Sequence, residues 1–487
     1  MSLRGSVLPG GPAAAPLDPG AAVLGAWLHV PHAAIGGPLE LEALKARLTV
    51  SPGGPARPGR RPADPRRLFL FTDRLPGYLG VPRAWGLRTF PELAVDDRTS
   101  AGRPLRARRL PSPDHPNVLD PEAQARFMAD VEGNLRRHRT MLISAGTGTG
   151  KTVVLLRAAA RLGVSTLILV HLERLLHQWR EEIADKLGLA EAEIGTVQSD
   201  RCDWDRPIAV GMLHSVAARR YPAPFYRAWG LVCFDEVDRV ATEQFLPAVG
   251  MFPSRYRAGM SATLHRPDGA DRAFFAHLGP VRARSRAAAM PMTVRVVRYR
   301  APAPVRGGVR SGPVPALMRD DARNALIVSL VVGLWSAGRQ VLVVSEGVMH
   351  LQRLARLCRE AGVPAADMGQ FTGSEQRVTP TGDGPRRVSR RRDEAELERV
   401  KREARLILAT YQMVTAGIDI PRLDAGLDAT PASSATQLVG RIRRPRPGKP
   451  RPVWITLVDE RSPVALRRFR SRLRDYAASD VEVVDDG

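Results

Sequence analysis

The stretch LISAGTGTGKTVVLL, residues 142–156, decides the fold of the chain. An apolar run precedes it, and a mostly apolar, helix-compatible run follows. Between them lies a loop of small residues: Gly146, Thr147, Gly148, Thr149 and Gly150. Such a loop can turn its backbone N–H groups inward, and the helix that opens at Lys151 and Thr152 favours an anion at its N-terminus. The pattern is G-x-x-x-x-G-K-S/T with Ala145 in place of the first glycine, and it predicts a phosphate-binding loop.

Lysine is rare in this chain, which makes Lys151 informative. The sequence has 73 Lys and Arg residues, of which five are lysines. A compact ammonium fits among loop amides as a point charge, whereas a guanidinium fork is broader. The stretch therefore predicts a nucleoside triphosphate site rather than the alternative, a simple glycine-rich turn.

Length and composition set outer limits on the class of protein. A chain of 487 residues is long enough for two or three domains. We find no apolar run of about 18 residues that would span a membrane and no signal-peptide core at the N-terminus. Three scattered cysteines suggest a reducing compartment, and we expect a cytoplasmic protein. The net charge of +23 favours a polyanionic partner such as nucleic acid, although a GC-rich genome would also enrich arginine.

Apolar strands alternate with helical segments over most of the chain, which predicts doubly wound parallel sheets. Two basic, proline-rich stretches interrupt this order and indicate linkers. We predict an α/β protein with two such domains after a small N-terminal α+β domain. The predicted parts are a tail (1–22), an accessory domain (23–95), a linker (96–118), a first α/β domain (119–299), a linker (300–318), a second α/β domain (319–475) and a tail (476–487).

Two adjacent carboxylates follow a second apolar strand in LVCFDEVDRV (231–240). Ligands of open α/β sheets bind at the carboxyl ends of the strands. Asp235 would hold the Mg²⁺ that accompanies the triphosphate, and Glu236 would act as general base on the attacking water. A solvated acidic turn is the alternative, which the upstream phosphate loop disfavours.

Two later segments carry further candidate site residues. Ser261, Ala262 and Thr263 follow an apolar strand and could couple the γ-phosphate to other parts of the protein. The segment ATQLVGRIRRPRPGKPRP (435–452) has the spacing Q-x-x-G-R-x-x-R, which places Gln437, Arg441 and Arg444 on one helix face. Arginines from a second domain could stabilise transition-state charge, whereas a solvated basic helix is the alternative.

Taken in order, these segments resemble the motifs of superfamily 2 helicases and translocases. The series runs through the phosphate loop, LVHLERLLHQW (169–179), IAVGMLHSV (208–216), DEVD, SAT, TAGIDIP (415–421) and QLVGRIRR. Within the superfamily, RYRAGMSATLHRPDG (255–269) looks closest to the XPB and phage UvsW group of DNA translocases. Asp238 departs from that group, in which histidine is usual. The resemblance covers about residues 119–459 and implies two tandem RecA-like domains.

The resemblance also implies the cofactors and a role for each matching residue. ATP and Mg²⁺ would be bound, with Lys151 on the β/γ-phosphates, Thr152 and Asp235 on Mg²⁺, and Glu236 activating water. Gln437, Arg441 and Arg444 would face the γ-phosphate, Gly417 and Asp419 would link the ATP state to the domain interface, and Gln124 would read adenine. Nucleic acid would pass near Ser215, Thr372 and Thr410.

The predicted function is that of an ATP-dependent DNA helicase or branched-DNA translocase, a monomeric motor of replication, recombination or repair. An RNA helicase is the first alternative, because the second motif reads D-E-x-D. A basic nucleic-acid-binding protein with a structural nucleotide site is another. A P-loop kinase or GTPase would leave the Q-x-x-G-R-x-x-R segment unexplained.

Overall fold

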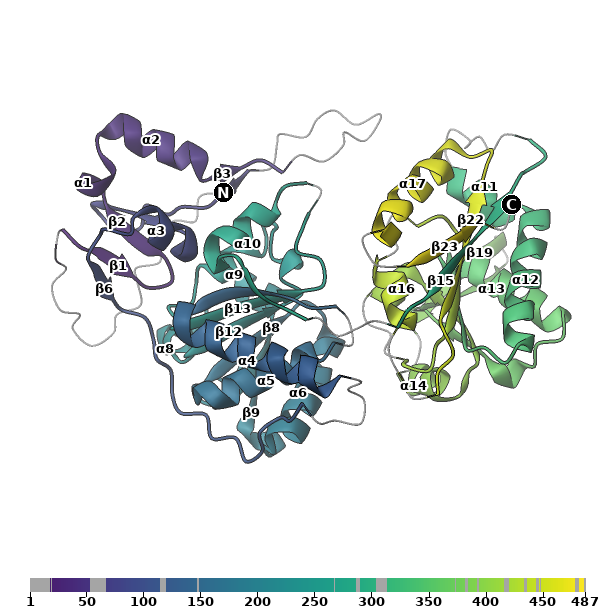
Figure 1. The fold of residues 1–487 in the computed structure, drawn as a ribbon, viewed down its shortest axis with the longest axis horizontal. Helices are drawn as coiled ribbons and strands as arrows, with labels where there is room; N and C mark the ends of the chain where they lie inside the picture. Colours follow the sequence, from purple (N-terminus) through teal and green to yellow (C-terminus); the bar gives the residue numbers. More distant parts are fainter. Residues whose placement is uncertain are drawn as a thin grey trace. The chain divides into compact units, whose positions relative to one another are not determined.

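The computed structural model describes most of the chain as two compact units, 1–287 and 288–487 (Figure 1). The described residues are 18, 20–52, 67–113, 120–146, 149–266, 268–285, 290–303, 313–372, 374–381, 384–391, 394–415, 420–432, 436–443, 446, 448–477 and 481–485. Each unit is described by itself below.

The first unit begins with a small α+β part. Its four-stranded sheet has the order β5 (Tyr78–Val81), β2 (Leu28–Pro31), β1 (Ala22–Leu24) and β6 (Val95–Asp97). A separate pair is formed by β3 (Thr49–Val50) and β4 (Leu68–Phe69). The helices are α1 (His32–Ile35), α2 (Pro38–Arg47) and α3 (Arg83–Thr89).

An eight-stranded sheet forms the main layer of the first unit. Its order is β10 (Arg201–Cys202), β9 (Ile194–Gln198), β11 (Ile208–Met212), β8 (Thr166–Val170), β12 (Leu231–Asp235), β13 (Tyr256–Ser261), β7 (Thr140–Ser144) and β14 (Val281–Arg284). All neighbours except β10 and β9 are parallel. The central strands are buried apolar runs, as expected when helices cover both faces of a sheet.

Helices of the first unit connect these strands. They are α4 (Pro121–His138), α5 (Lys151–Leu162), α6 (Glu173–Leu187), α7 (Leu213–Ala218), α8 (Ala223–Arg227), α9 (Leu246–Val249) and α10 (Asp271–Leu278), with short 3₁₀ turns η1 (Glu191–Glu193) and η2 (Val237–Arg239). Helix α4 begins where the Asp120 carboxylate accepts a hydrogen bond from the Ala123 amide at 2.8 Å. Helices α5 and α6 both end at a glycine in the left-handed region, Gly163 and Gly188.

The small N-terminal part and the large sheet share one hydrophobic core. Buried Leu28 and Val30 belong to the same cluster as Phe252 and Phe274. The indole of Trp27 donates to the Gly250 carbonyl at 2.9 Å. This part of the chain is therefore joined to the large sheet by packing, beyond its covalent connection.

The second unit is built on a seven-stranded, wholly parallel sheet. Its order is β17 (Met368–Phe371), β20 (Leu406–Thr410), β16 (Val341–Ser345), β21 (Ala425–Asp428), β22 (Val453–Asp459), β15 (Thr293–Tyr299) and β23 (Glu482–Asp485). The two sheets confirm the predicted α/β class with doubly wound parallel sheets.

Helices and a hairpin complete the second unit. They are α11 (Pro313–Arg319), α12 (Asp321–Ser336), α13 (Val348–Glu360), α14 (Glu394–Glu403), α15 (Tyr411–Thr415), α16 (Thr436–Ile442), α17 (Pro463–Ala477), the turn η3 (Ala365–Asp367) and the hairpin of β18 (Ser374–Thr381) with β19 (Gly384–Arg391). Buried Arg323 of α12 binds Asp459 at the end of β22 at 2.6 Å.

Strand membership differs from the predicted boundaries at two places. Strand β15 falls within the predicted first domain but pairs with β22 and β23 of the second sheet. Strand β23 falls within the predicted C-terminal tail. Strand β15 has the β-branched, partly alternating sequence TVRVVRY, which indicates a strand without indicating which sheet it joins, and β23 (EVVD) is too short to show a period.

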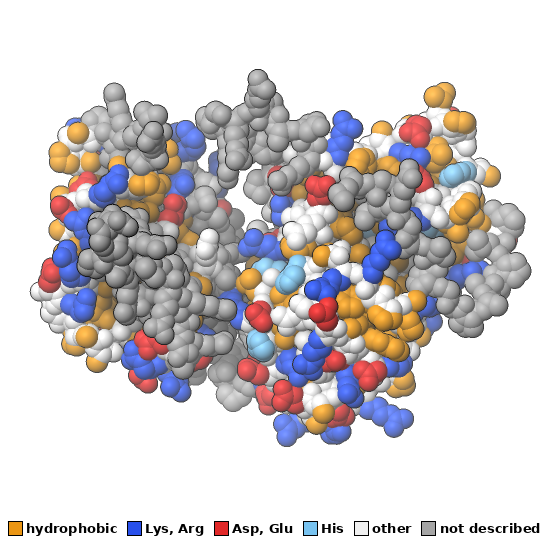
Figure 2. Space-filling model, turned by 180° about the vertical axis from the view of Figure 1, so that it is seen from behind, with side chains coloured by type: hydrophobic (Ala, Val, Ile, Leu, Met, Phe, Trp, Pro, Cys, Tyr) orange, Lys and Arg blue, Asp and Glu red, His pale blue; other side chains and the backbone are white. Residues whose placement is uncertain are grey.

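Among the described residues, no helix is long and apolar enough to cross a membrane. On the face seen in Figure 2, Lys and Arg side chains are interspersed with acidic ones, so the described residues show no single basic stripe there. Charge alone therefore does not mark a nucleic-acid path on this face.

Candidate active site

Three parallel strands of the first unit end side by side at the candidate active site. Strand β12 lies next to β13, and β13 next to β7, with Asp235 opposite Met260 and Ser261 opposite Ser144. The carboxyl ends of these strands carry the phosphate loop, the two adjacent carboxylates and the S-A-T segment. The fold thus places three motifs that are far apart in sequence at one sheet edge.

Lys151 and Glu236 form an ion pair at the centre of this edge. The Lys151 ammonium donates to a Glu236 carboxylate oxygen at 2.9 Å, and 12% and 24% of the two side chains are exposed. Glu236 has a φ of 50°, in the left-handed region that is unusual for a residue with a side chain. Backbone strain of this kind is concentrated at functional sites.

Asp235 is buried at the end of β12, and both of its oxygens have donors. Trp179 of α6 donates its indole N–H at 2.9 Å, and the Glu236 amide donates at 3.1 Å. Burial raises the pKa of the Asp235 carboxyl, while the Lys151 charge opposes that rise. No role was predicted for Trp179 from the sequence, although buried Leu176, Trp179 and Ile183 recur at helical spacing and mark the inner face of α6.

The donor set at this edge fits Mg²⁺ that arrives with a nucleotide. A hydroxyl at Thr152 and a carboxylate at Asp235 are oxygen ligands, and Mg²⁺ commonly takes only one or two protein ligands beside phosphates and water. The described residues contain no cluster of three or more His, Cys, Asp or Glu side chains that could hold a metal without such help.

Ser261 connects the S-A-T segment to the D-E-V-D segment. Its hydroxyl donates to the Asp238 carboxylate at 2.8 Å and lies 3.4 Å from a Glu236 oxygen. Arg266 donates to the Asp238 carbonyl at 2.7 Å. Burial, with a contribution from Glu236, raises the pKa of Asp238. Asp238, which departs from the XPB and UvsW group pattern, therefore has a defined place beside the general-base candidate.

Gln124 of α4 is buried against the end of the phosphate loop. A methyl group added at Gly150 would lie 2.4 Å from the Gln124 amide nitrogen, and Gly150 has a φ of 75°, so no other residue fits there without strain. The Gln124 amide nitrogen has no hydrogen-bond partner among the described residues. Adenine recognition by Gln124 stays a prediction.

Several predicted site residues lie in the second unit or outside the described residues. Arg441 is buried on α16. The Gln437 side chain and the residues Thr147, Gly148, Gly417, Asp419 and Arg444 lie outside the described residues. The predicted meeting of Arg441 and Arg444 with the nucleotide therefore stays a prediction.

The candidate nucleic-acid contacts are unequally exposed. Ser215 is buried, and its hydroxyl accepts a hydrogen bond from the Ser199 amide at 3.1 Å. Thr372 is also buried, whereas Thr410 is partly exposed at the end of β20. In this conformation Thr410 is the one of the three with an accessible side chain.

Comparison of the sequence with known proteins finds a family model that matches the region of this site. Residues 118–266 match the family model described as type III restriction enzyme, res subunit. An XPB DNA 3'-5' helicase of Mycobacterium tuberculosis is 34% identical over 28% of this chain and 25% of its own length. Helicase D10 of Escherichia phage T5 is 24% identical over 69% of this chain and 71% of its own. These matches support the predicted superfamily 2 helicase.

One further relative in sequence and one solved structure with a similar fold agree with a helicase. A mimivirus protein described as an ATP-dependent RNA helicase, L396, is 23% identical over 81% of the chain and 73% of its own length. A type I restriction enzyme HsdR fragment from Vibrio vulnificus covers 74% of the chain with a TM-score of 0.51 and 16% identity. The predicted ATP-hydrolysing helicase class is confirmed, and the XPB relatives agree with the predicted placement in the superfamily.

Proposed function

We propose that this helicase uses ATP hydrolysis to move along DNA, with a preference for duplex or branched substrates. The ion pair between Lys151 and Glu236 at the shared edge of β7, β12 and β13 carries the proposal. It supports the proposal because Lys151, the proposed phosphate ligand, lies beside Glu236, the proposed general base, and ATP hydrolysis needs both groups close together.

The proposed reaction begins with exchange of partners at Lys151. ATP phosphates would take the Lys151 ammonium away from Glu236, which leaves the Glu236 carboxylate available to accept a proton from water. Thr152 and Asp235 would hold Mg²⁺, which supplies charge neutralisation at the phosphates. Arg441 and Arg444 would stabilise the charge of the transition state, with Gln437 on the same helix face.

Two observations support DNA over RNA as the track. Two relatives that are 34% and 31% identical, over 28% and 35% of this chain, are DNA 3'-5' helicases of the XPB type. The sequence around S-A-T resembles the same group. The relative described as an RNA helicase matches more of the chain but at 23% identity, so RNA is the second candidate.

ATPase stimulation by different polynucleotides tests the choice of track. Duplex, single-stranded and forked DNA and single-stranded RNA are compared at equal nucleotide concentration, with salt varied because any basic chain binds polyanions at low ionic strength. We expect strong stimulation by duplex and forked DNA and weak stimulation by RNA at near-physiological salt. Stimulation by RNA alone would replace the DNA proposal, and no stimulation by any polynucleotide would refute the motor.

A Lys151→Ala variant is the control for contaminating ATPases. Its turnover should fall to background on every polynucleotide, whereas DNA binding without nucleotide should be retained. The N-terminal part, residues 23–95, is proposed to contribute to the preference for branched DNA, since the two α/β domains are expected mainly to track the phosphate backbone.

A further inference from the structure

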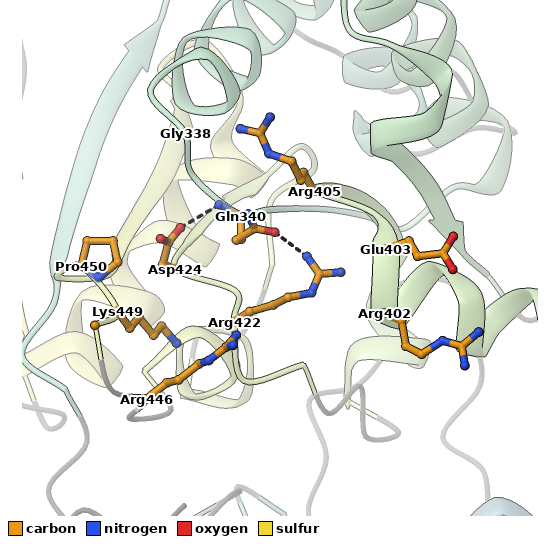
Figure 3. Close-up of a pocket in the computed structure, with 11 residues that line it drawn as sticks. Gly338, Gln340, Arg402, Glu403, Arg405, Arg422, Asp424, Arg446, Lys449 and Pro450 are labelled. Carbon is orange, nitrogen blue, oxygen red and sulfur yellow. Dashed lines mark hydrogen bonds between the residues drawn. The ribbon is translucent and has the colours of Figure 1, made fainter.

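A basic pocket lies at the amino edge of the second sheet, opposite to the edge at which parallel sheets bind their main ligands (Figure 3). Gln340 precedes β16, Arg405 precedes β20, Asp424 precedes β21 and Lys449 precedes β22, so the pocket is lined by residues that enter neighbouring strands. Its volume is about 530 Å³. Lys449 follows the motif QLVGRIRR, which ends at residue 444, and Gln340, Arg405 and Asp424 lie outside the motif series.

Cations exceed carboxylates among the residues that line this pocket. The cations are Arg402, Arg405, Arg422, Arg446 and Lys449, and the acids are Glu403 and Asp424. Both acids have partners of their own. Asp424 accepts from the Gln340 amide at 2.9 Å, and Glu403 lies 3.6 Å from Arg399 on α14. Arg405 is paired with Asp367 at 3.2 Å, and the four remaining cations still outnumber the two acids of the pocket.

Arg422 is held rigidly at the centre of the pocket. Its guanidinium donates to the Gln340 side-chain oxygen (Figure 3). It also donates to the Lys401 carbonyl at 2.9 Å. Within the described residues, Arg422 donates to the Gln340 side-chain oxygen and to the Val400 and Lys401 carbonyls, and none of these acceptors is a carboxylate. Burial lowers the pKa of Arg422, and the charge of Arg446 lowers it further. Two arginines thus repel each other across a space that an anion could fill.

We propose that this pocket binds phosphate groups of a polyanion. Arg422 supplies a pre-oriented guanidinium, and Arg446, Lys449 and Arg402 close around the bound group from the rim. Guanidinium groups bind phosphate oxygens in pairs of hydrogen bonds, and the half-buried position of Arg422 strengthens such contacts. The phosphate source is either a nucleic-acid backbone or a free oligophosphate, and the two arms of the test separate these sources.

The first arm measures a free oligophosphate. Inorganic tripolyphosphate is added to the full chain carrying Lys151→Ala, so that the nucleotide site does not compete. Binding should raise the Tm. The double change Arg402→Gln and Arg446→Gln should weaken the apparent Kd by about tenfold or more, because two charge-assisted contacts are lost. Both arginines are exposed, so the variant should fold, which its Tm without ligand checks.

The second arm measures duplex DNA binding as a function of salt. Removing two phosphate contacts should reduce the slope of log K against log salt by about two. The matched control is the double change Arg359→Gln and Arg467→Gln, which removes two exposed arginines elsewhere on the second unit. A change in the tripolyphosphate arm alone assigns a free oligophosphate, and a change in the duplex arm assigns the backbone. If the pocket variant matches the control in both arms, the proposal is wrong. Neither arm depends on ATP hydrolysis. Failure of the motor proposal would appear in the ATPase assay, whereas failure of the pocket proposal would appear in these two binding assays.

Discussion

The ammonium of Lys151 lies 2.9 Å from a carboxylate oxygen of Glu236, although the two residues are 85 positions apart in sequence. Each is the other's counter-ion in the absence of nucleotide. In the proposed reaction ATP phosphates compete with Glu236 for Lys151, so the charge of Glu236 would affect ATP binding as well as hydrolysis.

Glu236→Gln should lower the ATPase rate by at least about 100-fold, because an amide cannot accept the proton of the attacking water. The same change removes the counter-ion of Lys151, so ATP affinity should stay the same or rise. Steady-state ATPase and equilibrium binding of a fluorescent ATP analogue measure the two effects. A rate near wild type would remove Glu236 as the base.

Arg441→Ala or Arg444→Ala should each lower kcat about a thousandfold while DNA affinity changes little, if both arginines act on the transferred phosphate. Single-turnover ATPase and DNA anisotropy are the measurements. Normal ATPase with a large loss of DNA binding would show instead that this helix grips the nucleic-acid backbone.

Trp179→Phe should keep the packing of α6 while removing the hydrogen bond to Asp235. A buried acceptor that loses its donor destabilises a protein by about 1–3 kcal/mol. Urea unfolding measures that loss. The Mg²⁺ concentration that gives half-maximal ATPase should also increase, which a purely structural role for Trp179 would not produce.

Arg83→Ala tests the joint between the N-terminal part and the large sheet. Buried Arg83 donates to the Ser254 and Arg255 carbonyls at 2.7 and 2.8 Å, so its loss should destabilise the first unit by about 2–4 kcal/mol. Arg88→Ala, an exposed change on the same helix, is the control. Equal urea midpoints for the two variants would contradict a structural joint. Deletion of the whole N-terminal part would expose the shared core and is a less specific test.

His277→Phe should make stability less dependent on pH. His277 is buried, and its ring lies 4.8 Å from that of Trp27. Burial lowers its pKa to about 3, below the 6.5 of an exposed imidazole. Below pH 6.5 the His277 imidazole is therefore protonated in the unfolded chain but stays neutral in the folded chain. The free energy of unfolding falls as the pH is lowered from 6.5 towards 3.

For one such histidine, proton linkage lowers the free energy of unfolding by at most about 1.4 kcal/mol for each pH unit. His29, whose pKa burial lowers to about 4, should act in the same direction. Urea unfolding at pH 7 and pH 5 measures the slope, with exposed His214→Gln as control. An unchanged slope in His277→Phe would contradict the assignment.

The sequence by itself determined the class of fold and the motifs that meet at one sheet edge, whereas the chemical roles assigned to their residues stay predictions. Local patterns are sufficient here, because a glycine-rich loop between a strand and a helix can hold phosphate in only a few ways. Apolar runs that end in Asp235 or Ser261 likewise indicate the carboxyl edge of a parallel sheet. The motif order then added the helicase resemblance.

Only the tertiary structure decided which residues meet. Nothing in the pattern of β15 indicates that it joins the second sheet, and nothing near Trp179 predicts its hydrogen bond to Asp235. The same holds for Trp27 against His277 and for the cations gathered around Arg422. Such partners are chosen by packing between distant segments, where burial and hydrogen-bond satisfaction act on the whole fold, and a local periodicity of apolar residues carries no information about them.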